Sequence, residues 1–309
     1  MSTAANLVTS AADTVPDSEP AQRALFWSAA NNFQKGQPDV PCHVFVTERD
    51  RAIDEGTGTA LIPLDLSDRL GLDYPATVPN LLARYVRVAG GDEIAFELAS
   101  SGEAYYVMEG SGEVEKGDDR FTWAAGDVFV LPGAGGFTWI RADAGGALLW
   151  LVTDEPALAF FGVEKSPLRD EPGAVHYPAE SIEAEMALIH RRVDDGKQSG
   201  KAVLFTRADL TANHLATPTV AFAYNSLAPE DDQPPHRHNA AALTLCVQGE
   251  GVHSMVDGRK VDWLDRAVMV TPPSALHSHH NRGPAMMYSV VAQDGGVFYN
   301  ARTLGYASS

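Results

Sequence analysis

Two histidines separated by one residue, His236 and His238, follow a pair of prolines in this chain. Side chains alternate between the two faces of a β-strand, so both imidazoles point to one side and can meet one ion. A strand that returns antiparallel can bring a third histidine, His277, to the same place if the sheet closes on itself. Three neutral imidazoles suit Fe, Zn, Cu or Ni better than Mg or Ca. Such a site leaves positions open for water, substrate or oxygen.

A second group of histidines surrounds His277. By strand parity His279 faces the same side as His277, whereas His280 faces the opposite side. We therefore predict that His279 faces the substrate as the catalytic side chain, the alternative being a polar strand end. His253 lies on another predicted strand and stays open between a substrate-binding and a surface position.

Small side chains follow the histidine pair with matching parity. Ala242, Thr244 and Cys246 fall on the histidine-bearing face and are predicted to line the substrate-binding space. Such a pocket, mostly apolar with few polar anchors, has room for a ring-sized ligand. For Cys246 the alternative is a packed core thiol, because free cysteine behaves as a small buried hydrophobe.

Residues 234–281 resemble the two sequence motifs of the cupin superfamily. Ala242 stands where the first motif has its glutamate ligand. The positions that keep the motif spacing are His236, His238 and Gly249 in the first motif, and Pro272, His277 and Asn281 in the second.

Within that superfamily, the segments Pro-Pro-His-Arg-His and Pro-Ser-Ala-Leu-His-Ser-His-His-Asn are similar to those of gentisate 1,2-dioxygenases and their salicylate and hydroxynaphthoate relatives. Those enzymes are bicupins that hold Fe(II) with three histidines and no carboxylate. The resemblance implies an extradiol-type non-haem iron dioxygenase that uses O2 to cleave a small hydroxylated aromatic substrate. It also implies Fe(II) as the cofactor, with another divalent transition metal as the alternative, and a homodimer or homotetramer.

The chain departs from those enzymes in two ways. Thr244 stands where the family has an arginine for the substrate carboxylate, and the complete histidine set lies in the second half of the chain. Two other function classes stay open: a non-oxidative metal-dependent isomerase or lyase, and a small-molecule-binding cupin. Turnover without oxygen would favour the first, and weak metal binding with unchanged ligand would favour the second.

The chain is acidic, with a formal net charge of -18 over 309 residues. Nucleic acid and anionic membranes are polyanions, so neither is expected as a partner. Two cysteines give no disulfide framework. The sequence shows no secretory signal and no apolar run long enough to span a bilayer, so we expect a cytoplasmic location.

Gly and Asp punctuate short apolar runs over much of the chain, as in small antiparallel barrels. We predict an all-β bicupin fold, with two small antiparallel β-barrels of the jelly-roll type and a few short helices. The predicted divisions are a disordered tail (1–20), an N-terminal cupin (21–155), a connector with one helix (156–201) and a C-terminal cupin (202–309).

Finer predictions concern single elements. A short helix is expected over 21–33 and a connector helix over 181–193, where apolar residues recur at helical spacing. Strands over 40–45 and 58–66 are expected to wrap the first barrel.

The first barrel is predicted to lack metal ligands. Aligning Glu103 with Ala242 places Glu97 and Ala99 where the ligand histidines would be. A metal-free structural domain follows, the alternative being a hard cation between Glu97 and Glu103.

Overall fold

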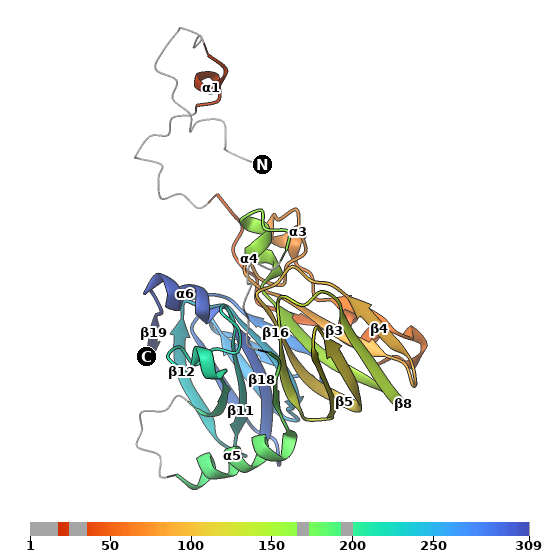
Figure 1. The fold of residues 1–309 in the computed structure, drawn as a ribbon. Coiled ribbons are helices and arrows are strands. Elements are labelled where there is room, and N and C mark those ends of the chain that lie inside the picture. Colours follow the sequence, from red (N-terminus) through yellow and green to blue (C-terminus); the bar gives the residue numbers. More distant parts are fainter. Residues whose placement is uncertain (1–17, 25–35, 166–172, 193–199, 309) are drawn as a thin grey trace. The chain divides into compact units, whose positions relative to one another are not determined.

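The computed structural model describes residues 18–24, 36–165, 173–192 and 200–308 (Figure 1). The chain divides into two compact units, Met1–Asp39 and Val40–Ser309, and both barrels belong to the second. In the first unit the described helix is α1 (Glu19–Gln22). Most of the predicted tail and most of the predicted helix over 21–33 lie outside the described residues.

The first barrel is built from antiparallel pairs around two long strands. β5 (Gly102–Lys116) and β8 (Thr138–Thr153) contain 15 and 16 residues and pair with each other through two register shifts. The other strands are β2 (Ala60–Pro63), β3 (Leu82–Val88), β4 (Glu93–Phe96), β6 (Asp119–Ala124), β7 (Val128–Pro132) and β9 (Val175–Tyr177).

The second barrel consists of two antiparallel sheets that face each other. Their strand orders are β1-β16-β13-β18-β11-β10 and β15-β14-β17-β12-β19. The strands are β1 (His43–Phe45), β10 (Lys201–Phe205), β11 (Ala221–Leu227), β12 (Asp232–His238), β13 (Ala242–Gln248), β14 (Val252–Val256), β15 (Arg259–Asp262), β16 (Val268–Thr271), β17 (His277–Asn281), β18 (Met287–Gln293) and β19 (Tyr306–Ser308). The predicted all-β bicupin fold is confirmed.

One strand belongs to a different barrel from the one predicted. Residues 40–45 were expected in the first barrel, but β1 pairs with β16 of the second, with Phe45 opposite Val268. β16 would otherwise present an open edge, and a strand added to it satisfies its free backbone groups. The strand expected over 58–66 does lie in the first barrel, where β2 pairs with β3.

The largest apolar core lies between the two barrels. Trp150 of β8 and Phe222 of β11 are fully buried in it, with ring centroids 5.6 Å apart. The interior of the first barrel holds a second apolar core, with Phe129 and Leu149 among its residues. Described residues inside the second barrel form only small apolar clusters. The second barrel therefore has room for polar groups.

Two buried aspartates mark corresponding places in the two barrels. Asp294, after β18, accepts hydrogen bonds from the Ala241 N–H (2.7 Å) and from the Asn80 side-chain amide (2.7 Å). Asp154, after β8, accepts one from the Thr219 hydroxyl (2.9 Å). Each carboxylate lies at the end of a strand in one barrel and accepts a hydrogen bond from a residue two positions before a strand of the other barrel.

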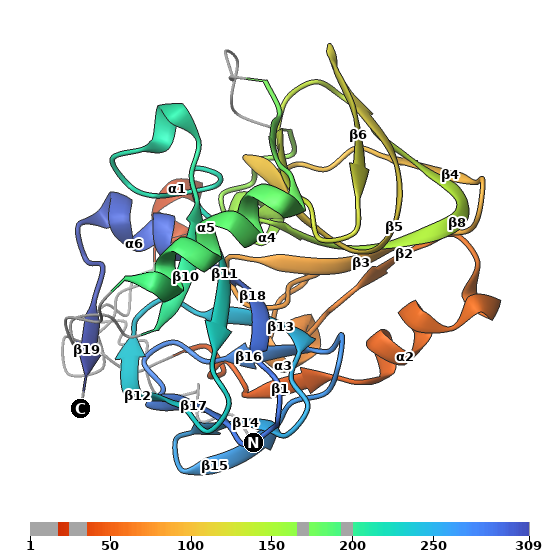
Figure 2. The same cartoon turned by 90° about the horizontal axis from the view of Figure 1, so that it is seen from below.

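The connector helix is confirmed as α5 (Ala179–Arg191), which buries Ile182 and Met186. It lies across β10 and β11 of the second barrel (Figure 2). The remaining helices are short: α2 (Thr47–Ile53), η3 (Glu55–Thr57), α3 (Ser67–Leu70), α4 (Glu155–Phe160), η4 (Ala208–Leu210) and α6 (Gly295–Ala301). Within the described ranges, none of the helices combines the length and the apolarity needed to cross a bilayer.

Candidate metal centre

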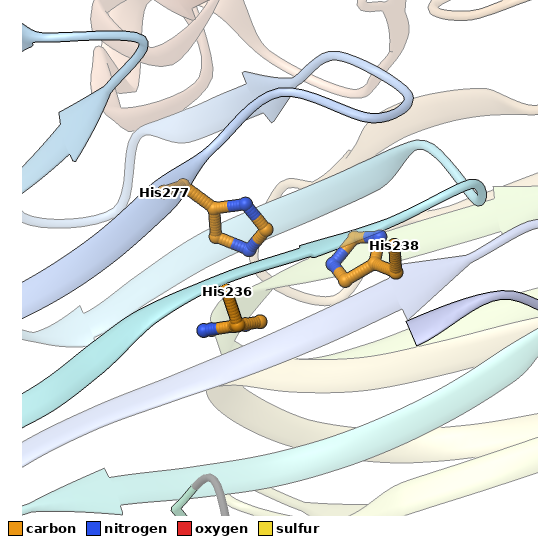
Figure 3. Close-up of side chains that lie close together, drawn as sticks. All are labelled: His236, His238 and His277. Carbon is orange, nitrogen blue, oxygen red and sulfur yellow. The ribbon is translucent and has the colours of Figure 1, made fainter. Parts of the chain in front are cut away.

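The structure brings His236, His238 and His277 together inside the second barrel (Figure 3). His236 and His238 lie on β12, and His236 is paired directly with His277 of β17. One nitrogen from each ring lies within 4.8 Å of the others. Nitrogen ligands bind transition metals at about 2.0–2.1 Å. An ion held by all three rings would therefore bring the nitrogens closer together.

Backbone carbonyls fix which nitrogen of each ring carries the proton. In all three histidines Nδ1 lies 2.8–2.9 Å from a carbonyl oxygen two residues away. A carbonyl only accepts hydrogen bonds, so Nδ1–H donates and Nε2 keeps its lone pair. Metal-binding histidines are commonly held in this way. The three Nε2 atoms are therefore available as metal ligands before any metal binds.

Burial also favours the neutral form of His238 and His277. It lowers the pKa of His277 to about 4, although the Ala275 carbonyl opposes that effect. Burial lowers the pKa of His238 as well. The Gln293 side-chain amide lies 3.3 Å from Nε2 of His238, where it can donate to the free lone pair.

A cavity of about 80 Å³ surrounds the three rings. Ala242 and Thr244 line it as predicted by strand parity, and Asn225, Ser289 and Gln293 add neutral polar groups. Its described lining contains no carboxylate and no arginine. A dipositive ion bound there would keep its charge until an anionic ligand arrived.

Among the described residues that border this cavity, the charged one is Lys201. It is paired with Ser226, whose hydroxyl contacts His190 of α5 (2.8 Å) on the outer face of the sheet. Paired residues share a face, so the Lys201 side chain points away from the metal.

His279 has the opposite proton arrangement. Its Nδ1 lies 2.7 Å from Ser254 Oγ, which also accepts the Trp263 indole N–H (2.8 Å). Among the described residues the Ser254 hydroxyl has no other acceptor, so its proton points to Nδ1 of His279. The His279 proton is then on Nε2. Burial, reinforced by His277, lowers the pKa of His279 to about 3, and the ring is a neutral hydrogen-bond donor.

Two other candidate substrate-binding residues lie elsewhere. His253 stacks on His280, with ring centroids 4.9 Å apart, and neither ring borders the cavity. His253 is paired with His280 in the sheet and so faces away from His279. Cys246 is buried but is not part of the cavity lining, and burial raises its thiol pKa to about 12. Cys246 therefore fits its alternative interpretation as a core thiol.

Three further residues belong to the site and were not predicted from the sequence. Asn225 lines the cavity, and Ser254 and Trp263 hold His279. Side chains alternate between the two faces along 221–227, and Asn225 falls on the same face as Ala221 and Ala223. This pattern would have indicated Asn225. No comparable signal connects Trp263 with His279, because that contact depends on strand pairing.

The corresponding strands of the first barrel carry no histidine. Phe96 of β4 is paired with Thr138 of β8, just as His236 is paired with His277. The position equivalent to His236 is therefore Phe96. The sequence alignment predicted Glu97 for this position, and that prediction is wrong. Glu103 follows Phe96 by seven residues, whereas its equivalent Ala242 follows His236 by six.

A buried ion pair occupies the interior of the first barrel instead. Lys116 Nζ lies 2.5 Å from a Glu103 carboxylate oxygen, and the Tyr105 hydroxyl (2.5 Å) and the Thr138 hydroxyl (2.9 Å) also donate to that carboxylate. Both charged side chains are fully buried. Among the described residues, the group that could hold a metal is the three-histidine set of the second barrel.

This combination defines a class of protein: a bicupin with a three-histidine centre in its second barrel. Residues 224–291 match the family model described as "Cupin domain". The fold is that of salicylate 1,2-dioxygenase from Pseudoaminobacter salicylatoxidans, solved as an adduct with gentisate. The TM-score is 0.72 at 12% identity, covering 92% of this chain and 89% of that one.

Individual relatives are similar over shorter stretches. Gentisate 1,2-dioxygenase from a Streptomyces species is 41% identical over 66 residues, which cover 21% of this chain and 18% of that protein. 5-Aminosalicylate 1,2-dioxygenase from a Comamonas species is 26% identical over 125 residues, covering 40% and 33% of the two chains. The chain thus matches a third or less of these relatives' lengths. The resemblance to the gentisate dioxygenase group is confirmed.

Proposed function

We propose that this protein is an Fe(II)-dependent dioxygenase of the extradiol type that cleaves the ring of a small hydroxylated aromatic compound. The observation that carries the proposal is the set of three histidines, His236, His238 and His277, in a cavity whose described lining has no carboxylate. The relatives named as gentisate and 5-aminosalicylate 1,2-dioxygenases support the reaction class.

Charge balance favours an anionic substrate. Three neutral ligands leave the dipositive charge of the iron uncompensated. A phenol with an adjacent carboxylate can bind through two oxygens and neutralise that charge. Because Thr244 and not an arginine lines this part of the cavity, the iron itself is the main partner for the carboxylate.

The protein side chains have separate roles in this proposal. The three ligand histidines present Nε2 lone pairs to Fe(II), which when bound supplies a binding site for the substrate oxygens and activates O2. His279 donates its Nε2–H within the same cavity and orients the bound substrate. Ala242 and Thr244 border the ring and keep the space narrow.

Oxygen consumption tests the proposal. We expect Fe(II)-loaded protein to consume one O2 per substrate with gentisate, salicylate, 5-aminosalicylate or hydroquinone, with loss of the aromatic absorbance. Zn(II)-loaded protein is the control, since zinc has no redox chemistry. No oxygen uptake across the panel would contradict a dioxygenase. Equal turnover by the zinc form without oxygen would indicate a non-oxidative enzyme.

A further inference from the structure

The metal cavity opens into a larger hollow. This outer hollow has a volume of about 600 Å³ and shares His236, His238 and Gln293 with the inner cavity of about 80 Å³. Its own walls are largely apolar, with Ala202 and Leu204 contributed by β10. A ligand held at the histidines can therefore extend outward into an apolar space.

Residues 304–306 form one wall of the outer hollow. Asn239, directly after the ligand His238, accepts a hydrogen bond from the Gly305 N–H (2.9 Å) and donates its side-chain amide to the Thr303 carbonyl (2.5 Å). β19 then pairs with β12, with Tyr306 opposite His238. Figures 1 and 2 both show β19 beside β12. The wall is therefore fixed to the strand that carries two metal ligands.

Tyr306 is the aromatic residue of this wall. Its ring stacks on His236, with centroids 5.5 Å apart and an angle of 28° between the planes. It lines the outer hollow, yet 57% of its surface is exposed. Much of the tyrosine ring is thus available to a ligand that already contacts the histidines.

We propose that Tyr306 is a specificity-determining residue, which selects hydroxylated aromatic acids that carry a second ring or a comparable apolar group. This inference rests on the proposed function. The inner cavity holds the chelating end of the ligand, and the outer hollow holds the apolar remainder against Tyr306, Leu204 and Leu304. Aromatic rings gain from contact with one another beyond the area that they bury.

Calorimetric titration of Fe(II)-loaded protein without oxygen tests this selection. Salicylate and 1-hydroxy-2-naphthoate offer the same chelating pair and differ by one ring. We expect wild-type protein to bind the naphthoate more tightly. In Tyr306→Ala the ratio of the two affinities should fall roughly tenfold, whereas Tyr306→Phe should retain it.

The control is Phe160→Ala, which removes an aromatic ring that is 73% exposed at the end of α4 and should leave the ratio unchanged. Iron content shows that each variant is folded. If Tyr306→Ala weakens both ligands equally, or neither, the selective role of Tyr306 is wrong while the proposed function stands. If wild-type protein binds neither ligand, the proposed function fails, and the selection fails with it.

Discussion

The position of one proton separates His279 from the three candidate ligands. Backbone carbonyls hold the proton on Nδ1 in His236, His238 and His277 and leave Nε2 free for a metal. Ser254 holds the opposite arrangement in His279. Four histidines in one cavity can therefore have two different roles, set by which ring nitrogen carries the proton.

Replacing Ser254 by alanine should disturb the role of His279. The substitution removes the hydroxyl that orients the ring, and we expect the loss to match the roughly 10–100-fold cost of removing the equivalent partner of a metal-binding histidine. We expect the turnover of Fe(II)-loaded Ser254→Ala to fall by about that factor, with iron content unchanged. Ser278→Ala is the matched control, because its hydroxyl contacts His280 (2.8 Å). Unchanged turnover in Ser254→Ala would rule out this orienting role.

Single residues could be predicted from the sequence where side chains of one chemical type recur at every second position of a strand. His236, His238 and His277 share parity and motif spacing, so their convergence could be predicted without coordinates. Cys246 has the same parity but lies outside the cavity lining. Parity gives the face of a strand, but not how deep along it the cavity extends.

Element pairing was harder to predict. β1 precedes the whole first barrel but completes the edge of the second, since a short apolar strand carries no information about a distant partner. The extra residue between Phe96 and Glu103 shifted the predicted equivalent of His236 from Phe96 to Glu97. A shift of one residue reverses every side chain in a strand.

The ion pair between β5 residues Glu103 and Lys116 leads to an element-scale prediction. Lys116→Met leaves a buried carboxylate without its cation and should lower the free energy of unfolding by about 3–5 kcal/mol. The double variant Glu103→Leu/Lys116→Met removes both charges and should recover much of that loss. Urea denaturation measures both.

The exposed pair Lys260 and Asp262 is the matched control for this cycle, with its nitrogen and oxygen 2.7 Å apart. Lys260→Met should change the stability little, because solvent screens such pairs. Equal losses in Lys116→Met and the double variant would show that Glu103 is not the cause of the destabilisation.

At the scale of the whole molecule, Asp294 connects the barrels and should make stability depend on pH. Burial raises its pKa from 3.8 to about 6. A raised pKa in the folded state gives a contribution that is complete below the unfolded value near 4 and is lost as pH rises through about 6. The corresponding free energy is about 3 kcal/mol.

Asp294→Asn removes this titration. Between pH 4 and pH 7 the stability of the variant should therefore rise relative to wild-type protein by about 3 kcal/mol. Urea denaturation at several pH values measures the difference. Asp118→Asn removes an exposed carboxylate and serves as the control. Parallel pH profiles for wild-type protein and Asp294→Asn would contradict a buried titrating carboxylate at the junction.

Metal content tests the central claim most directly, because everything proposed for the second barrel depends on one ion bound by three rings. After loading with Fe(II) without oxygen and removal of excess metal, elemental analysis should find one iron per chain in wild-type protein. Iron should be nearly absent from His236→Ala, His238→Ala and His277→Ala. His280→Ala, which alters a ring outside the cavity lining, should keep its iron. Iron retained in the His277→Ala protein, or absent from the wild-type protein, would contradict the three-histidine centre.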